Sequence, residues 1–223
     1  MPFSIEPSPE IAFRHDFPLL CNARGYKDAV EVGVDCGVFA ADFLRRFEGH
    51  WLFLVDPYER CPEFDTDRTL DAMVAAQALM PYHGRFRFIR KPSPEAIPFV
   101  CGLISPSFVY IDGSHAEPDV YADIRAWWGV IPETGAIAGH DFDPLHPGVC
   151  AAVERFAREE DVVVRITSRE AGDFPPSWYI YRTEPETLHV RFFDSRDIPN
   201  PHHAGQTAGR NGQAGLPVLS EAR

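Results

Sequence analysis

The sequence lacks the long apolar runs and basic clusters that would direct a chain to a membrane or to nucleic acid. No apolar stretch reaches the roughly 18 residues that a membrane-spanning helix requires, and the N-terminus shows no charged-then-apolar signal pattern. Acidic residues outnumber basic ones by 33 to 21, which gives a net charge of -12. Because phosphate contacts need clustered lysine and arginine, this balance argues against broad nucleic-acid binding. We therefore expect a soluble cytoplasmic protein that binds neither membrane nor nucleic acid.

Cysteine patterns that would mark a disulfide framework or a zinc site are missing as well. The five cysteines are odd in number and scattered, and none forms a Cys-x-x-Cys pair. This distribution is typical of reduced thiols, most of which we expect to pack as small core residues. At 223 residues, the chain is long enough for one α/β domain with a sizeable core but too short for two full domains and a linker.

Seven short apolar runs predict the strands of a single sheet. They lie within 28–33, 51–57, 85–91, 107–115, 135–142, 162–166 and 178–181. Segments with a helical spacing of apolar residues, such as 67–80 and 147–160, separate most of these runs. This alternation is typical of a doubly wound, mostly parallel α/β sheet, in which the run at 85–91 resembles an edge strand. We expect the last strand to be antiparallel, because only a loop separates it from the strand before it.

The predicted domain spans residues 25–182. Residues 1–24 precede it as an N-terminal arm and a short helix. The arm, over 1–10, is proline-rich and expected to be irregular. The helix is expected over 16–25, where an aspartate stands near its start and a glycine at its end. We expect this helix to pack beside the ligand cleft.

The C-terminal extension, residues 183–223, departs from the strand and helix pattern. After 199 it is rich in glycine, proline, asparagine and glutamine and has almost no large apolar residues. Such a composition predicts a largely disordered tail. We interpret His202 and His203 in this tail as a solvated pair rather than a metal site.

The chain is organised around a predicted strand, glycine turn and helix at 28–44. Gly33 and Gly37 bracket the turn, and without a Cβ atom they would let a ligand approach the backbone at the helix N-terminus. Asp56 ends the next strand, 19 positions after Gly37. In open α/β sheets a carboxylate at that place binds the hydroxyls of an adenosine ribose, so the stretch predicts an adenosine cofactor.

The charges around this turn favour a cationic cofactor over a dinucleotide. The spacing Gly33-x-x-x-Gly37 lacks the Gly-x-Gly-x-x-Gly pattern that cradles a pyrophosphate. Glu31 and Asp35 place carboxylates in or beside the turn, where they would repel a pyrophosphate but not an ammonium or a sulfonium. A helix-capping role for Asp35 stays open and is compatible with ligand binding. S-adenosylmethionine is the cofactor that this combination predicts.

These motifs resemble those of class I S-adenosylmethionine-dependent methyltransferases over about residues 25–182. The turn Glu31-Val-Gly-Val-Asp-Cys-Gly37, Asp56 and the seven-strand pattern carry the resemblance. A narrower similarity, to the macrocin and mycinamicin O-methyltransferase group, is carried by Tyr110-Ile-Asp-Gly-Ser-His115, Gly139-His-Asp141 and Pro147-Gly-Val149. The resemblance implies a Rossmann-like methyltransferase sheet and methyl transfer to oxygen.

The narrower resemblance also implies a divalent metal and a base at the ends of the fourth and fifth strands. Matched by motif, Asp112, His140 and Asp141 would hold the metal, and His115 would be the base. Carboxylate ligands suit Mg²⁺, Mn²⁺ or Ca²⁺, whereas His140 stands where relatives commonly carry an acid and favours softer metals. Asp112 and His115 would be the catalytic residues, since together they could hold the acceptor hydroxyl and take its proton. Turn-forming roles for Asp112 and Asp141 and an orienting role for His115 stay open.

Two further residues have two interpretations each. Ser93, after the third strand, is expected either near the adenine or as the N-cap of the following helix. Tyr58 is expected either to flank the cofactor or to cover the core. The predicted cofactor-binding residues are Glu31, Gly33, Asp35, Gly37, Asp56, Ser93 and Asp112.

The sequence thus predicts an S-adenosylmethionine-dependent O-methyltransferase, metal-assisted in one version, that acts on a small hydroxylated molecule such as a sugar or natural product. One alternative is an NAD- or nucleotide-sugar-linked oxidoreductase, which the missing third glycine and the acidic turn disfavour. The other is a catalytically inactive cofactor-binding scaffold, which the polar residues at both strand ends disfavour. We expect the N-terminal arm, the loop at about 59–66 and the loop after His140 to form the acceptor pocket, and a homodimer stays open.

Overall fold

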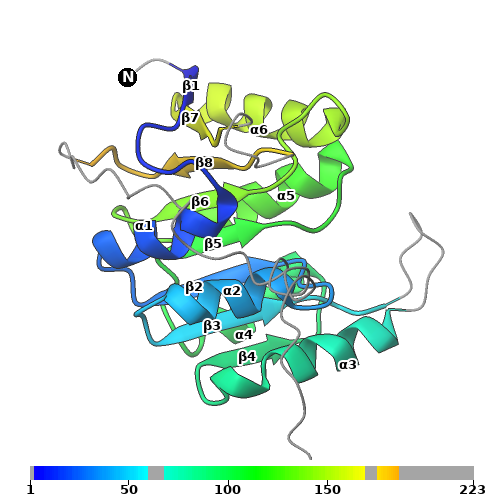
Figure 1. Ribbon diagram of the computed structural model, residues 1–223. Coiled ribbons are helices and arrows are strands. Elements are labelled where there is room, and N and C mark those ends of the chain that lie inside the picture. Colours follow the sequence, from blue (N-terminus) through cyan, green and yellow to red (C-terminus); the bar gives the residue numbers. More distant parts are fainter. Residues whose placement is uncertain (1–2, 60–67, 169–174, 186–223) are drawn as a thin grey trace, which may run out of the picture. The chain divides into compact units, whose positions relative to one another are not determined.

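An eight-stranded sheet forms the centre of the described part of the chain (Figure 1). The computed structural model describes residues 3–59, 68–168 and 175–185, all of them in the unit Met1–Phe192. The strands are β1 (Ser4–Pro7), β2 (Asp28–Val32), β3 (Trp51–Val55), β4 (Phe86–Ile89), β5 (Phe108–Ile111), β6 (Ala136–Gly139), β7 (Val163–Ile166) and β8 (Trp178–Tyr181). Their order across the sheet is β1-β7-β8-β6-β5-β2-β3-β4.

The strand directions confirm the mostly parallel sheet that the sequence predicts. All neighbouring strands pair in parallel except β8, which lies between β6 and β7 and is antiparallel to both. Each of the seven predicted runs contains one of the strands β2 to β8, and β4 lies at one edge, as its alternating pattern predicts. The fold is therefore a Rossmann-like doubly wound sheet with its last strand reversed.

The N-terminal arm differs from the irregular segment that the sequence predicts. Ser4–Pro7 forms β1, which pairs in parallel with β7, with Ser4 opposite Val163 and Pro7 opposite Ile166. Without β1, the outer edge of β7 would present unpaired N–H and C=O groups. Pro7 is tolerated because β1 is itself an edge strand, where a missing donor interrupts no central ladder. This segment is therefore a strand because it pairs with β7, and not because of its local propensity.

Six α-helices in the described residues cover the two faces of the sheet. They are α1 (Phe17–Ala23), α2 (Val38–Arg46), α3 (Thr69–Ala78), α4 (Ser93–Cys101), α5 (Glu117–Trp128) and α6 (Pro147–Glu160), with short 3₁₀ turns η1 (Arg14–Asp16) and η2 (Met80–Tyr82). Buried residues of α1, α2 and α3 share one core, and those of α4, α5 and α6 share the other. The predicted helices at 16–25, 67–80 and 147–160 are confirmed, the last with the predicted bounds.

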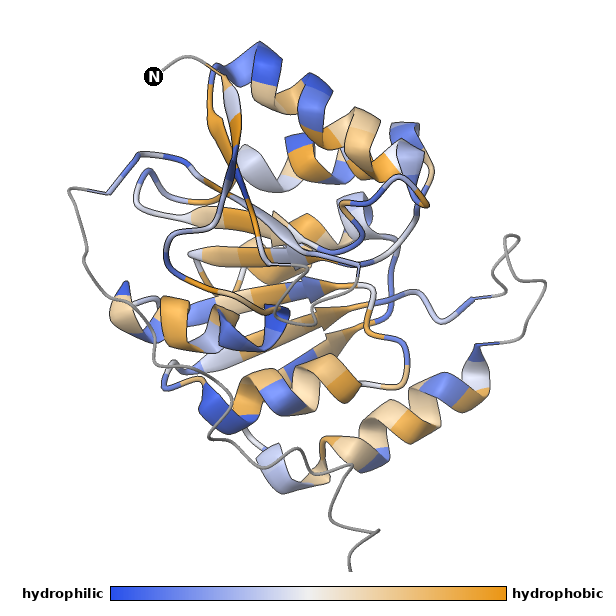
Figure 2. Cartoon of the chain, turned by 45° about the horizontal axis from the view of Figure 1, so that its top comes forward, coloured by the Kyte–Doolittle hydropathy of each residue, from blue (hydrophilic) through white to orange (hydrophobic). Residues whose placement is uncertain are grey.

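The two cores follow from the alternation of strand residues. Successive side chains of a strand point to opposite faces, so Ala29 joins the core beneath α1 to α3 and Val30 joins the core beneath α4 to α6. Trp127 and Trp128 are buried in the second core, as predicted for this helix face. Figure 2 shows the result, with mostly apolar strands inside and helices in which apolar and polar residues alternate.

The carboxyl ends of the central strands lie side by side, and this places the candidate site. Backbone hydrogen bonds continue past the strands: Gly33 N–H donates to Val55 O at 2.9 Å and Asp112 N–H to Val32 O at 2.7 Å. His140 N–H likewise donates to Ile111 O at 3.0 Å. The residues that follow β2, β3, β5 and β6 are therefore held at one edge of the sheet.

The four cysteines in the described residues are free thiols, as predicted. Cys21 is buried, but Cys101 is exposed and Cys36 and Cys150 are partly exposed, so the expectation that most cysteines pack in the core is wrong. Cys101 is the last residue of α4. Sequence alone does not reveal which face of a helix a small thiol occupies.

Several predictions concern parts of the chain beyond these ranges. Most of the expected acceptor loop at about 59–66, and the C-terminal tail with His202 and His203, lie outside the described residues. Among the residues that the structure describes, no helix combines the length and apolar character needed to cross a membrane.

Candidate active site

The turn after β2 packs tightly against its neighbours. Gly33 has a φ of +84°, and a Cβ atom there would stand 2.0 Å from the backbone oxygen of Asp112. Gly37 has a φ of +74°, and its Cβ would stand 3.1 Å from Ala75 on α3. The expectation that the missing Cβ atoms leave open space for a ligand is therefore wrong, because protein atoms fill that space. Both positions still require glycine for their positive φ, and contact between the turn and a cofactor stays a prediction.

Asp56, at the end of β3, holds this turn in place. Its Oδ2 accepts hydrogen bonds from the N–H groups of Val34 at 3.0 Å and Asp35 at 3.2 Å. Its Oδ1 accepts one from Tyr58 N–H at 2.8 Å. Asp35 and Tyr58 have φ values of +49° and +50°, a conformation that non-glycine residues rarely adopt. The Asp56 carboxylate thus stabilises strained backbone on both sides of the predicted ribose position. Tyr58 is buried, which supports its core-covering role.

Glu31 lies on β2 beneath the turn and is only 2 % exposed. Burial raises the pKa of this carboxyl well above its ordinary value, the charge of Asp112 raises it further, and Arg14 acts in the opposite direction. Its Oε2 is buried and, within the described residues, has no hydrogen-bond partner. A buried polar atom without a partner is costly, and a ligand ammonium would supply one. This orphaned oxygen fits the cationic amino-acid end of S-adenosylmethionine.

Asp35 does not cap α2, so the capping interpretation is wrong. Gly37 occupies the N-cap position, and no side-chain capping bond is present. The Asp35 carboxylate instead accepts a hydrogen bond from Arg68 Nη2 at 2.8 Å. Arg68 also lies 3.8 Å from Asp56 Oδ2 and donates from Nε to Asp71 Oδ2 at 2.6 Å. An arginine that precedes α3 therefore neutralises part of the acidic turn.

Ser93 begins α4 but does not cap it, because its side chain turns inward. Pro92 is the N-cap residue, and Ser93 Oγ accepts a hydrogen bond from Trp127 Nε1 at 2.8 Å. The same hydroxyl bonds to Asp123 on α5. Burial raises the pKa of Asp123 to about 6, although the bond from Ser93 acts against the rise. The capping interpretation of Ser93 is wrong, and its contact with an adenine stays a prediction.

Asp112, His140 and Asp141 meet at the ends of β5 and β6, as the sequence predicts. His140 Nδ1 lies 2.9 Å from Asp141 Oδ1 and 3.8 Å from Asp112 Oδ1. Burial raises the pKa of Asp112, and the neighbouring His140 partly offsets the rise. One donor atom of each residue lies within 4.8 Å of the others. The arrangement fits a divalent ion held by two carboxylates and one imidazole.

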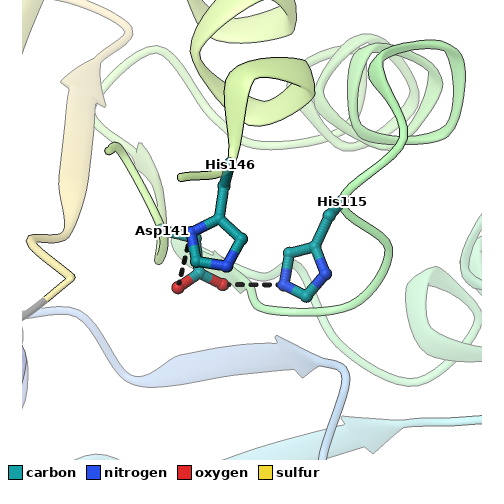
Figure 3. A group of neighbouring side chains, drawn as sticks. All are labelled: His115, Asp141 and His146. Atoms are coloured by element: carbon teal, nitrogen blue, oxygen red, sulfur yellow. Dashed lines mark hydrogen bonds and ion pairs between the residues drawn. The ribbon is translucent and has the colours of Figure 1, made fainter. Parts of the chain in front are cut away.

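Two further imidazoles flank Asp141 (Figure 3). His115 Nε2, from the loop after β5, lies 3.0 Å from Asp141 Oδ2, and His146 Nδ1 lies 3.8 Å from Asp141 Oδ1. Although burial alone would raise the pKa of Asp141, the hydrogen bonds from His140 and His115 and the charge of His146 lower it to about 2. Asp141 also has a positive φ of 62°. The low pKa means that the Asp141 carboxylate is ionised, and its oxygens contact imidazole nitrogens instead of capping a turn.

Three residues at this edge were not singled out from the sequence. His146 directly precedes the Pro147-Gly148 start of α6 and is its N-cap residue. Arg14, in the 3₁₀ turn η1 just before the predicted helix, places Nη1 3.7 Å from Asp112 Oδ2, so the chain that leads into this helix reaches the candidate site. Neither Arg14 nor Arg68 has a spacing signal, because each reaches the edge from a different segment of the chain.

Comparison with known proteins bears on this edge directly. The sequence model of one family, described as a methyltransferase domain, matches residues 30–142. The match includes the glycine turn, Asp56, Asp112, His140 and Asp141. No curated protein matches the chain in sequence.

Several solved structures share the fold at low sequence identity. The cofactor-bound protein Rv0187 from MTB has a TM-score of 0.57 and 15% identity, over 77% of this chain and 80% of that one. An O-methyltransferase from Bacillus cereus, in complex with SAH, has a TM-score of 0.55 and 14% identity, over 75% and 80%. The O-methyltransferase TomG from Streptomyces achromogenes, involved in tomaymycin synthesis and solved with SAM, has a TM-score of 0.57 and 15% identity, over 77% and 79%. At such identity the likeness shows a common fold.

Proposed function

Because the chain belongs to the methyltransferase-domain family that its sequence matches, we propose that it transfers the methyl group of S-adenosylmethionine to a hydroxyl oxygen of a small molecule. The observation that carries the cofactor is the acidic turn. Glu31 is buried with an orphaned oxygen, and Asp35 and Asp56 follow at the same edge. Three carboxylates would oppose a pyrophosphate, whereas a ligand with an ammonium and ribose hydroxyls gives them partners.

The protein's part in methyl transfer is to align two reactants and remove one proton. S-adenosylmethionine, when bound, supplies a methyl group that its sulfonium already activates. The acceptor hydroxyl must lose a proton to become a good nucleophile. His115 is the proposed proton acceptor, since ionised Asp141 lies 3.0 Å from its Nε2 and would stabilise the imidazolium that forms.

A divalent ion is the second part of this proposal. Asp112, His140 and Asp141 would hold it, and it would lower the pKa of an acceptor hydroxyl bound beside it. Arg14, 3.7 Å from Asp112, adds a positive charge at the same place. Because one ligand is an imidazole, Mn²⁺ would suit the site better than Mg²⁺ or Ca²⁺.

The acceptor that we propose is a small hydroxylated molecule, such as a sugar or a natural product. The pocket at the carboxyl ends of β5 and β6 is narrow and is lined by Asp112, His115, His140, Asp141 and Trp178. That the similar protein TomG takes part in tomaymycin synthesis supports a natural-product acceptor.

Calorimetric titration of the purified protein tests the cofactor. The ligands are S-adenosylhomocysteine and NADH, each in the presence of Mn²⁺ and of a chelator. Binding of S-adenosylhomocysteine without binding of NADH is the expected result. Tight NADH binding with no response to S-adenosylhomocysteine would refute the proposal and favour the oxidoreductase alternative.

Radiolabelled methyl transfer tests the reaction and the metal separately. The protein is incubated with labelled S-adenosylmethionine and a panel of hydroxylated sugars and natural products. Label in an ether product is expected. Cofactor binding without transfer to any acceptor of the panel would favour the inactive scaffold. Transfer that is equal in chelator and in Mn²⁺, and unchanged in Asp141→Ala, would remove the metal while leaving methyl transfer intact.

A further inference from the structure

Two imidazoles and one carboxylate converge at the start of α6 (Figure 3). One donor atom each from His115, Asp141 and His146 lies within 4.8 Å of the others. The two imidazole rings approach different oxygens of Asp141, with their centroids 4.7 Å apart and their planes tilted by 33°. This set is different from the group of Asp112, His140 and Asp141, with which it shares only Asp141.

We propose that His115, Asp141 and His146 form a binding site for a transition-series dication such as Zn²⁺ or Co²⁺. Imidazole nitrogen is a good ligand for these ions, whereas Mg²⁺ and Ca²⁺ prefer oxygen ligands and several of them. One carboxylate and two neutral imidazoles would leave further coordination positions open. The site is therefore selective against the hard ions that the neighbouring group would accept.

The bonding state of His146 supports this site. Its Nδ1 is buried and makes no hydrogen bond in the described part of the chain, although Asp141 Oδ1 lies 3.8 Å away. A ring nitrogen at that distance from a carboxylate is too far for a hydrogen bond. Two ligands of one metal ion, however, stand apart by more than a hydrogen-bond length, because each is about 2 Å from the ion. The geometry suits a bridging ion better than a direct contact.

The backbone around the three side chains is held in place before any ion binds. His146 N–H donates to Asp143 O at 2.8 Å, and its carbonyl accepts from Val149 N–H at 3.1 Å. A Cβ atom at Gly148 would stand 2.3 Å from the backbone oxygen of His115. This close approach of α6 to the loop after β5 keeps His115 and His146 together. Preorganised ligands lose little conformational entropy when they bind an ion.

Occupation of this site has a consequence for methyl transfer, and this part rests on the proposed function. The ion would engage Asp141, which otherwise supports His115, and it would engage His115 itself. The proton acceptor and one ligand of the neighbouring group would then be lost together. Zn²⁺ is therefore expected to inhibit the enzyme, and His146 would be needed for the inhibition.

Metal binding by the full-length protein tests the site independently of any reaction. Zn²⁺ and Co²⁺ are titrated calorimetrically into wild type, His146→Ala and a control, His83→Ala, whose histidine is exposed. The reference protein, called wild type in this experiment, and both variants also carry His202→Ala and His203→Ala, so that this histidine pair contributes nothing to metal binding. We expect His146→Ala to weaken Zn²⁺ binding by about tenfold or more, because even the loss of groups that only orient metal ligands costs ~10- to 100-fold. The control should bind as wild type does.

Three results would overturn the proposal. They are the absence of Zn²⁺ binding, equal Zn²⁺ affinity in wild type and His146→Ala, and a Co²⁺ spectrum with the strong charge-transfer band of a thiolate ligand. His146→Gln and thermal melting curves show whether a loss of binding reflects unfolding. In crystals soaked with Zn²⁺, anomalous scattering beside His146 supports the site, and a peak only beside Asp112 contradicts it. Zn²⁺ binding without inhibition would refute the catalytic consequence alone.

Discussion

The carboxyl edge of the sheet has two halves that use carboxylates in opposite ways. The turn half follows β2 and β3 and consists of Glu31, Asp35 and Asp56. The histidine half follows β5 and β6 and consists of Asp112, His115, His140, Asp141 and His146. In the turn half, Asp56 accepts hydrogen bonds from backbone N–H groups, Asp35 accepts one from Arg68, and Glu31 Oε2 has no hydrogen-bond partner in the described residues. In the histidine half, imidazoles surround Asp141.

Two carboxyls, Glu31 and Asp141, show what this difference does. Both are buried, with 2 % and 8 % exposure. Burial raises the pKa of Glu31, whereas the three imidazoles lower the pKa of Asp141 to about 2. Burial therefore opposes the charge of Glu31 when no cation is near, whereas the imidazoles stabilise the charge of Asp141. The turn half leaves a buried carboxyl oxygen without a partner in the described residues, whereas in the histidine half imidazole nitrogens already lie against the Asp141 carboxylate.

Substitution of the proposed base, His115, should have the largest effect. This effect should be confined to the histidine half. His115→Ala is expected to lower the rate of methyl transfer by about 10²- to 10⁴-fold, the usual contribution of a general base. Binding of S-adenosylhomocysteine at the turn half should not change. The checks are initial rates with an identified acceptor across neutral pH, and rescue by added imidazole. His83→Ala is the control. A variant that keeps most of its activity at all pH values would show that another group takes the proton.

Gly33 is where the two halves touch, so its substitution should damage both. In Gly33→Ala the new Cβ would meet the Asp112 backbone oxygen at 2.0 Å, in addition to the strain of a positive φ. We expect a loss of about 3 kcal/mol or more in the free energy of unfolding, measured with urea. Gly84 has a similar φ of +89° and open space around it, so Gly84→Ala isolates the strain, about 1–2 kcal/mol. Equal losses in the two variants would contradict the close approach at Gly33.

A third buried carboxyl, that of Asp123, shows the effect of burial on a pKa where no imidazole is among the causes. Asp123 on α5 bonds to Ser93 on α4 and is not among the residues of either half. Its pKa is raised by burial from 3.8 to about 6, so the folded state keeps a proton that the unfolded state releases. Stability is then fully present below about pH 4 and falls as the pH rises to about 6, by about 3 kcal/mol at most.

Asp123→Asn should abolish this loss, because the amide cannot ionise. At pH 7 the variant is expected to be about 1–3 kcal/mol more stable than wild type, with the difference disappearing near pH 4. Urea unfolding at a series of pH values measures it, and Glu48→Gln, at an exposed acid, is the control. If Asp123→Asn follows the wild-type pH dependence, burial does not raise this pKa.

Substitution of Glu31 tests the turn half by itself. Glu31→Gln should weaken binding of S-adenosylhomocysteine by about 10- to 100-fold, since a hydrogen bond to a charged group contributes ~1.5–3 kcal/mol. Calorimetric titration with S-adenosylhomocysteine measures the affinity, with Glu48→Gln as control. Unchanged affinity would place the ligand ammonium elsewhere.

Much of the fold was predictable because it depends on local patterns. The apolar runs ending at Val55, Ile111 and Gly139 predict buried parallel strands, and each forms one. The spacing of apolar residues predicts α6 with its bounds. β1 could not be predicted, since Ser4–Pro7 is a strand only through its pairing with β7. The exposure of Cys101 depends in the same way on how α4 packs against the rest of the fold.

The candidate site was predictable to the extent that its residues follow strands. Asp112, His140 and Asp141 directly continue β5 and β6, and the alignment of parallel strands brings them together. The local roles suggested for Asp35 and Ser93 were wrong, because Arg68 and Trp127 reach their side chains from other segments. Local propensity does not include such partners.

The sequence by itself determined the order of strands and helices, the acidic glycine turn and the membership of the methyltransferase-domain family, since these depend on residue types at fixed spacings along the chain. The tertiary structure decides which carboxyl is stabilised in its charged form. Burial raises the pKa of Glu31, whereas three imidazoles within a few ångströms of Asp141 lower its pKa. Residues distant in sequence supply those surroundings, so the pattern of charge is a property of the folded chain.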